Sequence, residues 1–118
     1  MNKAIQEAWA LELESGKHEQ GFGVLHVVET ERKCCLGVLC DMAFRAGVVT
    51  RVIDYNIDGR PNVYMYGTTK NGGSLPEEVT DWAELDSGVP EVDGHSLIGW
   101  NDILQQSFVS IANLVRKL

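Results

Sequence analysis

The chain has 118 residues, a length typical of one compact domain. Its composition, 44% hydrophobic and 23% charged, excludes an intrinsically disordered chain, and no apolar run approaches the roughly 20 residues that span a bilayer. The formal net charge of −7 is unevenly distributed. Residues 1–70 hold nine acids and eight bases, whereas residues 71–115 hold eight acids and no Lys or Arg. Because duplex binding draws on several Lys/Arg–phosphate contacts, the second half is not expected to bind nucleic acid.

The acidic stretch 71–115 has two interpretations. It is either an ordinary solvated surface that favours solubility, or a patch that docks on a basic partner or imitates nucleic acid. The N-terminal segment is acidic and amphipathic rather than basic and then apolar, so we do not expect it to be a signal peptide.

Residues 2–14 are predicted to form a helix, because Ile5, Ala8, Trp9 and Leu13 recur at helical spacing and make one apolar face. Ser15-Gly16 ends it, since glycine suits a left-handed cap. Residues 24–28 are a short strand candidate, and residues 29–33 are typical of a turn.

Residues 34–46 (CCLGVLCDMAFRA) are apolar on nearly every side, which predicts the central buried helix of the domain. Gly47 follows at the expected stop position. Gly37 lowers the stability of a helix interior by about 1 kcal/mol relative to Ala. We therefore expect Gly37 to lie in close contact with another stretch of backbone.

Residues 48–57 and 61–66 are rich in β-branched and aromatic residues, and Asp58-Gly59 between them is a strong hairpin signal. Ser74 to Glu77 has the spacing of a capping box with an early proline, which predicts a short helix. Its buried stripe would contain Leu75, Val79, Trp82 and Ala83.

Residues 86–94 are expected to be irregular, because Gly88 and Pro90 interrupt them. Apolar residues at helical spacing from Phe108 to Leu118 predict a last helix, with Ser107 as its cap. The prediction for residues 1–118 is one small α+β domain. In it a central apolar helix packs with a β-hairpin or small antiparallel sheet and about three further helices.

Five stretches of the chain carry recognisable motifs: SGKHEQG (15–21), CCLGVLCD (34–41), LPEEV (75–79) with Trp82, Leu97 to Asp102, and Ser107 to Ala112. Together they resemble the pattern of a family of small uncharacterised tailed-phage and prophage proteins. The resemblance covers most of the chain, and the cysteine octapeptide is its most specific part. The chain departs from the family pattern at Lys33, at Trp100, and at Ile103 to Gln106. The family has no established activity to carry over. The resemblance implies a phage origin, and hence a small accessory or host-takeover protein in a bacterial cytoplasm.

Three cysteines are an odd number, and the adjacent Cys34 and Cys35 are poorly placed for an ordinary bridge, which favours a reducing compartment. These thiols are interpreted first as core packing, since free cysteine is among the most buried residues. The alternatives are redox sensing and a nucleophile at Cys34 or Cys35. Such a nucleophile would use His26 or His95 as base, oriented by Asn101 or Asp102. The cysteine and histidine spacing does not predict a zinc site.

Basic and aromatic residues gather around the expected hairpin. Arginine pairs bidentately with phosphate, and tyrosine can stack on a base, so these residues could bind a small anionic, nucleotide-like ligand. Arg51 and Tyr55 share one strand parity, and Tyr64 and Tyr66 share another on the partner strand. An ordinary half-exposed hairpin is the other interpretation. The candidate ligand-binding residues are Arg45, Arg51, Tyr55, Arg60, Tyr64, Tyr66, Trp100 and Asn101.

The leading hypothesis is a phage-encoded accessory protein that acts by binding. We expect it to sequester either a nucleotide-type immune signal or a host protein during infection. A cysteine-dependent hydrolase and an acidic mimic that blocks a basic host surface are the alternatives. We expect no cofactor, no bulk nucleic-acid binding and no membrane partner, and the sequence leaves homo-oligomerisation open.

Overall fold

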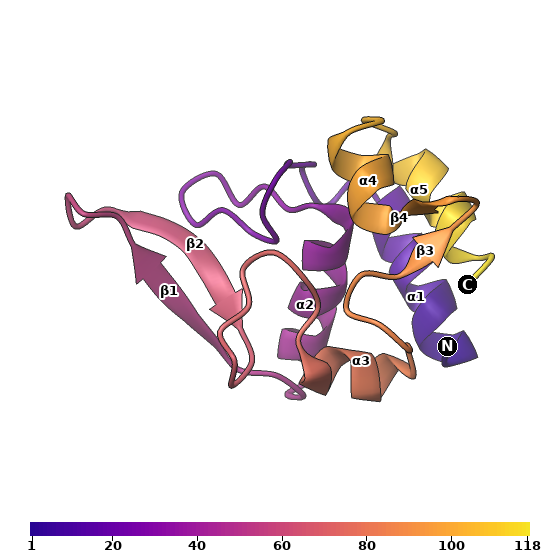
Figure 1. The fold of residues 1–118 in the computed structure, drawn as a ribbon, viewed down its shortest axis with the longest axis horizontal. Coiled ribbons are helices and arrows are strands. Elements are labelled where there is room, and N and C mark those ends of the chain that lie inside the picture. Colours follow the sequence, from indigo (N-terminus) through magenta and orange to yellow (C-terminus); the bar gives the residue numbers. More distant parts are fainter.

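Helix α2 (Cys35–Arg45) runs through the centre of the fold, in a computed structural model that describes residues 1–118 (Figure 1). Its first six residues and Ala43 are buried. A Cβ atom on Gly37 would overlap the Leu25 carbonyl oxygen, which also accepts a hydrogen bond from Cys34 N at 3.2 Å. The expected close backbone contact at Gly37 is therefore confirmed.

Helices α1 (Lys3–Glu14) and α5 (Phe108–Val115) pack against each other and bring the two ends of the chain together. Asn2 caps α1 by accepting a hydrogen bond from Ile5 N, and Ser107 caps α5 by accepting one from Ser110 N, as predicted for Ser107. Gln6 is buried in this contact and donates to Val115 O at 2.8 Å. The two terminal helices thus close one side of the core around α2.

Helix α3 (Glu77–Ala83) forms where a short helix was predicted, and Leu75, Val79 and Ala83 are buried. The predicted capping box does not form, because Pro76 occupies the N-cap position and no side chain caps the helix. The expectation of an irregular segment 86–94 was partly wrong. Glu91–Val92 (β3) pairs with His95–Ser96 (β4), and helix α4 (Leu97–Asp102) follows directly.

Strands β1 (Arg51–Tyr55) and β2 (Pro61–Tyr66) form the predicted antiparallel hairpin, which projects from the helical part of the molecule (Figure 1). The first strand is shorter than the predicted 48–57, because Val48 N still donates to Ala43 O at the end of α2. The turn spans residues 56–60 and is closed by Asn56 N donating to Arg60 O at 2.8 Å, with Gly59 at a positive φ of 82°.

The strand expected at 24–28 is reduced to isolated bridges that attach β2 to the body. Val28 N donates to Asn62 O, and Tyr64 N donates to His26 O, both at 3.0 Å. With five helices and two small antiparallel sheets, the predicted α+β class is confirmed. None of the helices combines the length and the apolar character needed to cross a membrane.

Candidate binding site at the base of the hairpin

A chain of hydrogen bonds joins the base of the hairpin to the segment before α2. Arg51 Nη1 lies 3.5 Å from Tyr66 Oη, Tyr66 Oη lies 2.8 Å from His26 Nδ1, and His26 Nε2 lies 2.6 Å from a Glu31 carboxylate oxygen. A guanidinium can only donate and a carboxylate can only accept. The direction is therefore fixed: Arg51 donates to Tyr66, Tyr66 donates to His26, and His26 donates to Glu31. We call this chain the relay.

The two middle residues of the relay are buried, and burial controls their protonation. His26 and Tyr66 are both fully buried. Burial lowers the pKa of His26, and nearby Lys33 and Arg51 lower it further, although the hydrogen bond to Glu31 acts in the opposite direction. Burial also raises the pKa of the Tyr66 hydroxyl. At neutral pH the relay thus contains a neutral imidazole and a neutral phenol between a guanidinium and a carboxylate.

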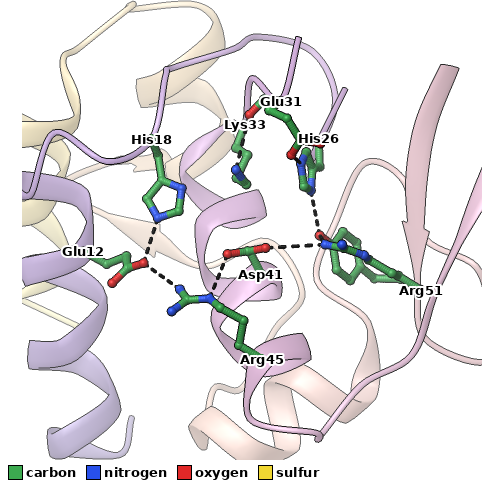
Figure 2. A network of polar contacts seen from close by, with 9 residues as sticks. Glu12, His18, His26, Glu31, Lys33, Asp41, Arg45 and Arg51 are labelled. Atoms are coloured by element: carbon green, nitrogen blue, oxygen red, sulfur yellow. Dashed lines mark hydrogen bonds and ion pairs between the residues drawn. The ribbon is translucent and has the colours of Figure 1, made fainter. Parts of the chain in front are cut away.

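A second set of polar contacts continues from Arg51 to helices α2 and α1 (Figure 2). Asp41 accepts from Arg51 Nη1 at 3.5 Å and from Arg45 Nε at 3.0 Å. Arg45 also donates to Glu12 at 2.6 Å, and His18 lies 2.8 Å from the same Glu12 oxygen. Burial raises the pKa of Glu12, but the contacts with His18 and Arg45 outweigh it and lower the pKa overall. Asp41 thus links Arg51 to Arg45, and Arg45 links this set to Glu12 on α1.

The Arg51 guanidinium also lies between two aromatic rings. Its central carbon is 4.0 Å from the centroid of the Phe44 ring and 4.1 Å from that of Tyr64. Both distances are within the range of a cation–π contact. Phe44 is 37% exposed and the Arg51 side chain 23% exposed, so this stack borders solvent. We call Phe44, Arg45, Arg51 and Tyr64 the hairpin face.

The structure brings together only part of the predicted ligand-binding set. Arg45, Arg51, Tyr64 and Tyr66 gather at the base of the hairpin, linked through Asp41 and the relay. Tyr55 lies near the far end of β1, and Arg60 lies in the turn, where its nearest carboxylate is Asp58 at 3.7 Å. The far end of the hairpin, where β1 ends and the turn lies, projects away from the base (Figure 1).

Trp100 and Asn101, the other two predicted residues, lie on α4 and serve packing. Trp100 Nε1 donates to Val92 O at 2.8 Å. Asn101 is fully buried: its Oδ1 accepts from Gln20 Nε2 at 2.8 Å and from Cys35 N at 3.3 Å. Both atoms of its amide are occupied, because Nδ2 donates to Gly21 O and to Asp102.

Sequence reasoning missed Asp41, Phe44 and His26 as members of the arginine cluster. Asp41 and Phe44 belong to the apolar helix that was interpreted only as core. The spacing of Asp41 and Arg45, four residues apart on a helix, was the available signal for their ion pair. Phe44 carried no such signal, because a phenylalanine in an apolar run is typical of a buried position, whereas its ring is 37% exposed.

The three cysteines are free and buried. Burial raises the pKa of Cys34 to about 11 and also raises the pKa values of Cys35 and Cys40. Cys35 Sγ donates to Leu97 O at 3.5 Å. The two ring nitrogens of His26 are already bonded to Tyr66 and Glu31, and His95 packs edge-on against Trp100. These features favour packing over nucleophilic chemistry, which needs a lowered thiol pKa and a free base.

A cavity of about 190 Å³ lies away from the hairpin face. It is lined by the carboxylates of Glu84, Asp86 and Glu91 and by apolar side chains that include Leu85 and Pro90. None of the predicted ligand-binding residues lines it. Three carboxylates at its wall disfavour an anionic ligand. No group of three or more His, Cys, Asp or Glu side chains is placed to hold a metal ion.

Searches of curated proteins and of solved structures found no match to the chain. One family does match, over residues 1–117, and it is described as a domain of unknown function, DUF8296. Since the match extends over almost the whole chain, the protein belongs to the DUF8296 family.

Proposed function

We propose that this protein acts by binding a partner protein through the hairpin face. The observation that carries the proposal is the position of Arg51, whose guanidinium lies over the rings of Phe44 and Tyr64, at 4.0 and 4.1 Å, with oxygens of Asp41 and Tyr66 at 3.5 Å. Arginine and aromatic side chains are enriched among the residues that dominate protein–protein binding energies. A side chain already ordered in the free protein loses little conformational entropy when a partner binds.

A protein is a better match for this face than a small molecule. The Arg51 guanidinium already donates to Asp41, and the only cavity found lies elsewhere, between carboxylates. Small-molecule sites are concave and bury most of the ligand, whereas protein interfaces are flatter surfaces with a few aromatic and arginine anchors. Both considerations favour a protein surface over a nucleotide-like ligand.

The resemblance to phage proteins suggests where the partner comes from. We propose a phage origin and a bacterial host protein as the partner, bound and thereby sequestered in the host cytoplasm during infection. Sequestration by binding needs no catalytic group at the hairpin face. It also makes the effect on the host depend on affinity rather than on turnover.

The test begins with capture by the tagged full-length chain from a bacterial lysate and continues with the purified partner in calorimetric titration. Phe44→Ala is expected to weaken binding by about 2 kcal/mol, roughly 30-fold, as for a truncated interface anchor. Phe22→Ala is the matched control, because Phe22 is another exposed phenylalanine, 50% exposed against 37% for Phe44, outside the hairpin face. Its affinity should equal that of the wild type.

Two results would contradict the proposal. Equal affinities for the Phe44→Ala and Phe22→Ala variants would place the contact on another surface. Binding of a nucleotide from a titrated panel, lost in Arg51→Ala, would instead assign the function to a small anionic ligand.

A further inference from the structure

The outer edge of β1 carries backbone groups without partners. In β2, Tyr64 N donates to His26 O, and Tyr66 exchanges two hydrogen bonds with Asn71, at 2.7 and 2.9 Å. Tyr64 and Tyr66 therefore direct their backbone groups away from β1. Along an antiparallel ladder, successive residues direct their backbone N–H and C=O groups alternately toward and away from the neighbouring strand. Val63 and Met65 therefore direct theirs toward β1, where Val63 is opposite Asp54 and Met65 is opposite Val52.

The same alternation leaves the other residues of β1 facing outward. The N–H and C=O groups of Arg51, Ile53 and Tyr55 point to the free edge, and the sheet contains no third strand there. Protein edges are usually protected by lysine, proline or a covering segment. The strand, RVIDY, has neither lysine nor proline; its Arg51 lies 3.5 Å from Asp41, and Asp54 is its one other charged residue. Val52 is 47% exposed and Tyr55 58% exposed, so this edge is open and partly apolar.

We propose that a second copy of this chain pairs with β1 in an antiparallel, two-fold symmetric arrangement centred on Ile53. In this register Ile53 lies opposite Ile53 of the second copy, and Arg51 lies opposite Tyr55 of the second copy. Every outward N–H and C=O group of the three residues then has a partner. A register centred on Asp54 would place two like charges opposite each other, which is destabilising.

The charge distribution also favours a second copy at this end. Residues 51–66 contain two arginines and two aspartates and are therefore neutral, within a chain of net charge −7. The acidic residues 71–115 lie mainly on the opposite side of the molecule from the hairpin (Figure 1). Pairing through β1 thus keeps the two acidic segments apart, which limits their mutual repulsion.

The second copy would complete the hairpin face. Arg51, Ile53 and Tyr55 project on the same side of the hairpin as Tyr64 and Tyr66, because Arg51 pairs with Tyr66 and Ile53 with Tyr64. Opposed residues in a hydrogen-bonded pair have Cα atoms about 5.5 Å apart. Tyr55 of the second copy therefore adds a third aromatic ring beside Arg51. The structure of one copy leaves Tyr55 distant from Arg51, and the dimer would bring the two residue types together.

The experiment combines sedimentation with residue-resolved amide hydrogen exchange on the full-length protein at low and high concentration. We expect a dimer whose amides at Arg51, Ile53 and Tyr55 become protected as concentration rises. The amides of Val52 and Asp54, bonded within the hairpin, should be protected at every concentration. A monomer at all concentrations would overturn the proposal. A dimer in which the three outward amides still exchange freely would overturn it too.

A substitution provides a second, independent readout. Ile53→Pro removes only an outward N–H group, a position where an edge strand tolerates proline, and should shift the protein to a monomer. Val52→Thr, on the opposite face of the same strand, should remain dimeric. If Ile53→Pro does not fold, the exchange data on the unmodified chain still decide the matter. A monomeric protein that binds its partner through Phe44 would refute the dimer and leave the proposed function standing.

Discussion

Removing one hydroxyl from the relay tests whether it holds the hairpin in place. Tyr66→Phe keeps the buried ring but deletes the Oη that donates to His26 Nδ1 at 2.8 Å and accepts from Arg51 at 3.5 Å. The loss leaves His26 Nδ1 buried without a donor. Leaving a buried polar atom unpaired costs about 1–3 kcal/mol. The Arg51 contact, at the limit of hydrogen-bond length, adds little. We therefore expect a loss of about 2 kcal/mol in the free energy of unfolding.

Urea unfolding followed by circular dichroism measures this loss. The midpoint should fall while the slope of free energy against urea stays the same, because the area exposed on unfolding is unchanged. Tyr55→Phe is the matched control: its ring is 58% exposed and its hydroxyl has no hydrogen-bond partner in the protein. Its stability should stay within about 0.5 kcal/mol of the wild type, as for surface substitutions in general. Equal stabilities of the two variants would refute the structural role assigned to the relay.

Three further predictions concern the core and the titratable groups. Gly37→Ala should destabilise the fold by about 1–3 kcal/mol in the same assay, because the added methyl group would overlap Leu25 O. This loss should exceed the gain from alanine's higher helix propensity. A variant as stable as the wild type, or more stable, would contradict the close contact between Gly37 and Leu25. Because burial lowers the pKa of His26, the unfolded chain binds its proton first; stability is therefore complete above about pH 6.5 and is lost as pH falls from there through the lower pKa of the folded state. His26→Gln should flatten this dependence between pH 8 and 5.5, and an unchanged slope would exclude His26 as its source. The cysteines should react with iodoacetamide only after unfolding, because burial raises their pKa values; labelling of native Cys34 would restore the hydrolase hypothesis.

The sequence predicted those elements that are determined by residues close together along the chain. The apolar run 34–46 identified the central helix, Asp58-Gly59 identified the hairpin, and Gly37 indicated a close backbone contact. Helix α4 was missed because its six residues are too short for a helical period to emerge, and they include Gly99. The short β3–β4 pair was missed for a similar reason, since two-residue strands have no alternation to detect.

The candidate site was only half predictable. Strand parity correctly placed Tyr64 and Tyr66 on one side of the hairpin, and the register puts Arg51 with them. The partners that fix Arg51 come from elsewhere: Asp41 and Phe44 from a helix that looked wholly internal, and His26 from a segment expected to be an ordinary strand. Such long-range contacts leave no periodicity in the sequence, so only the folded arrangement reveals them.

The most direct test of a hairpin-mediated binding function is a chemical-shift map of the isotopically labelled protein, recorded while the captured partner is added. We expect the largest changes at Phe44, Arg45, Arg51 and Tyr64, with the acidic residues 77–102 unaffected. Changes concentrated in that acidic segment, with the hairpin face unperturbed, would contradict binding through the hairpin face and favour an acidic mimic instead.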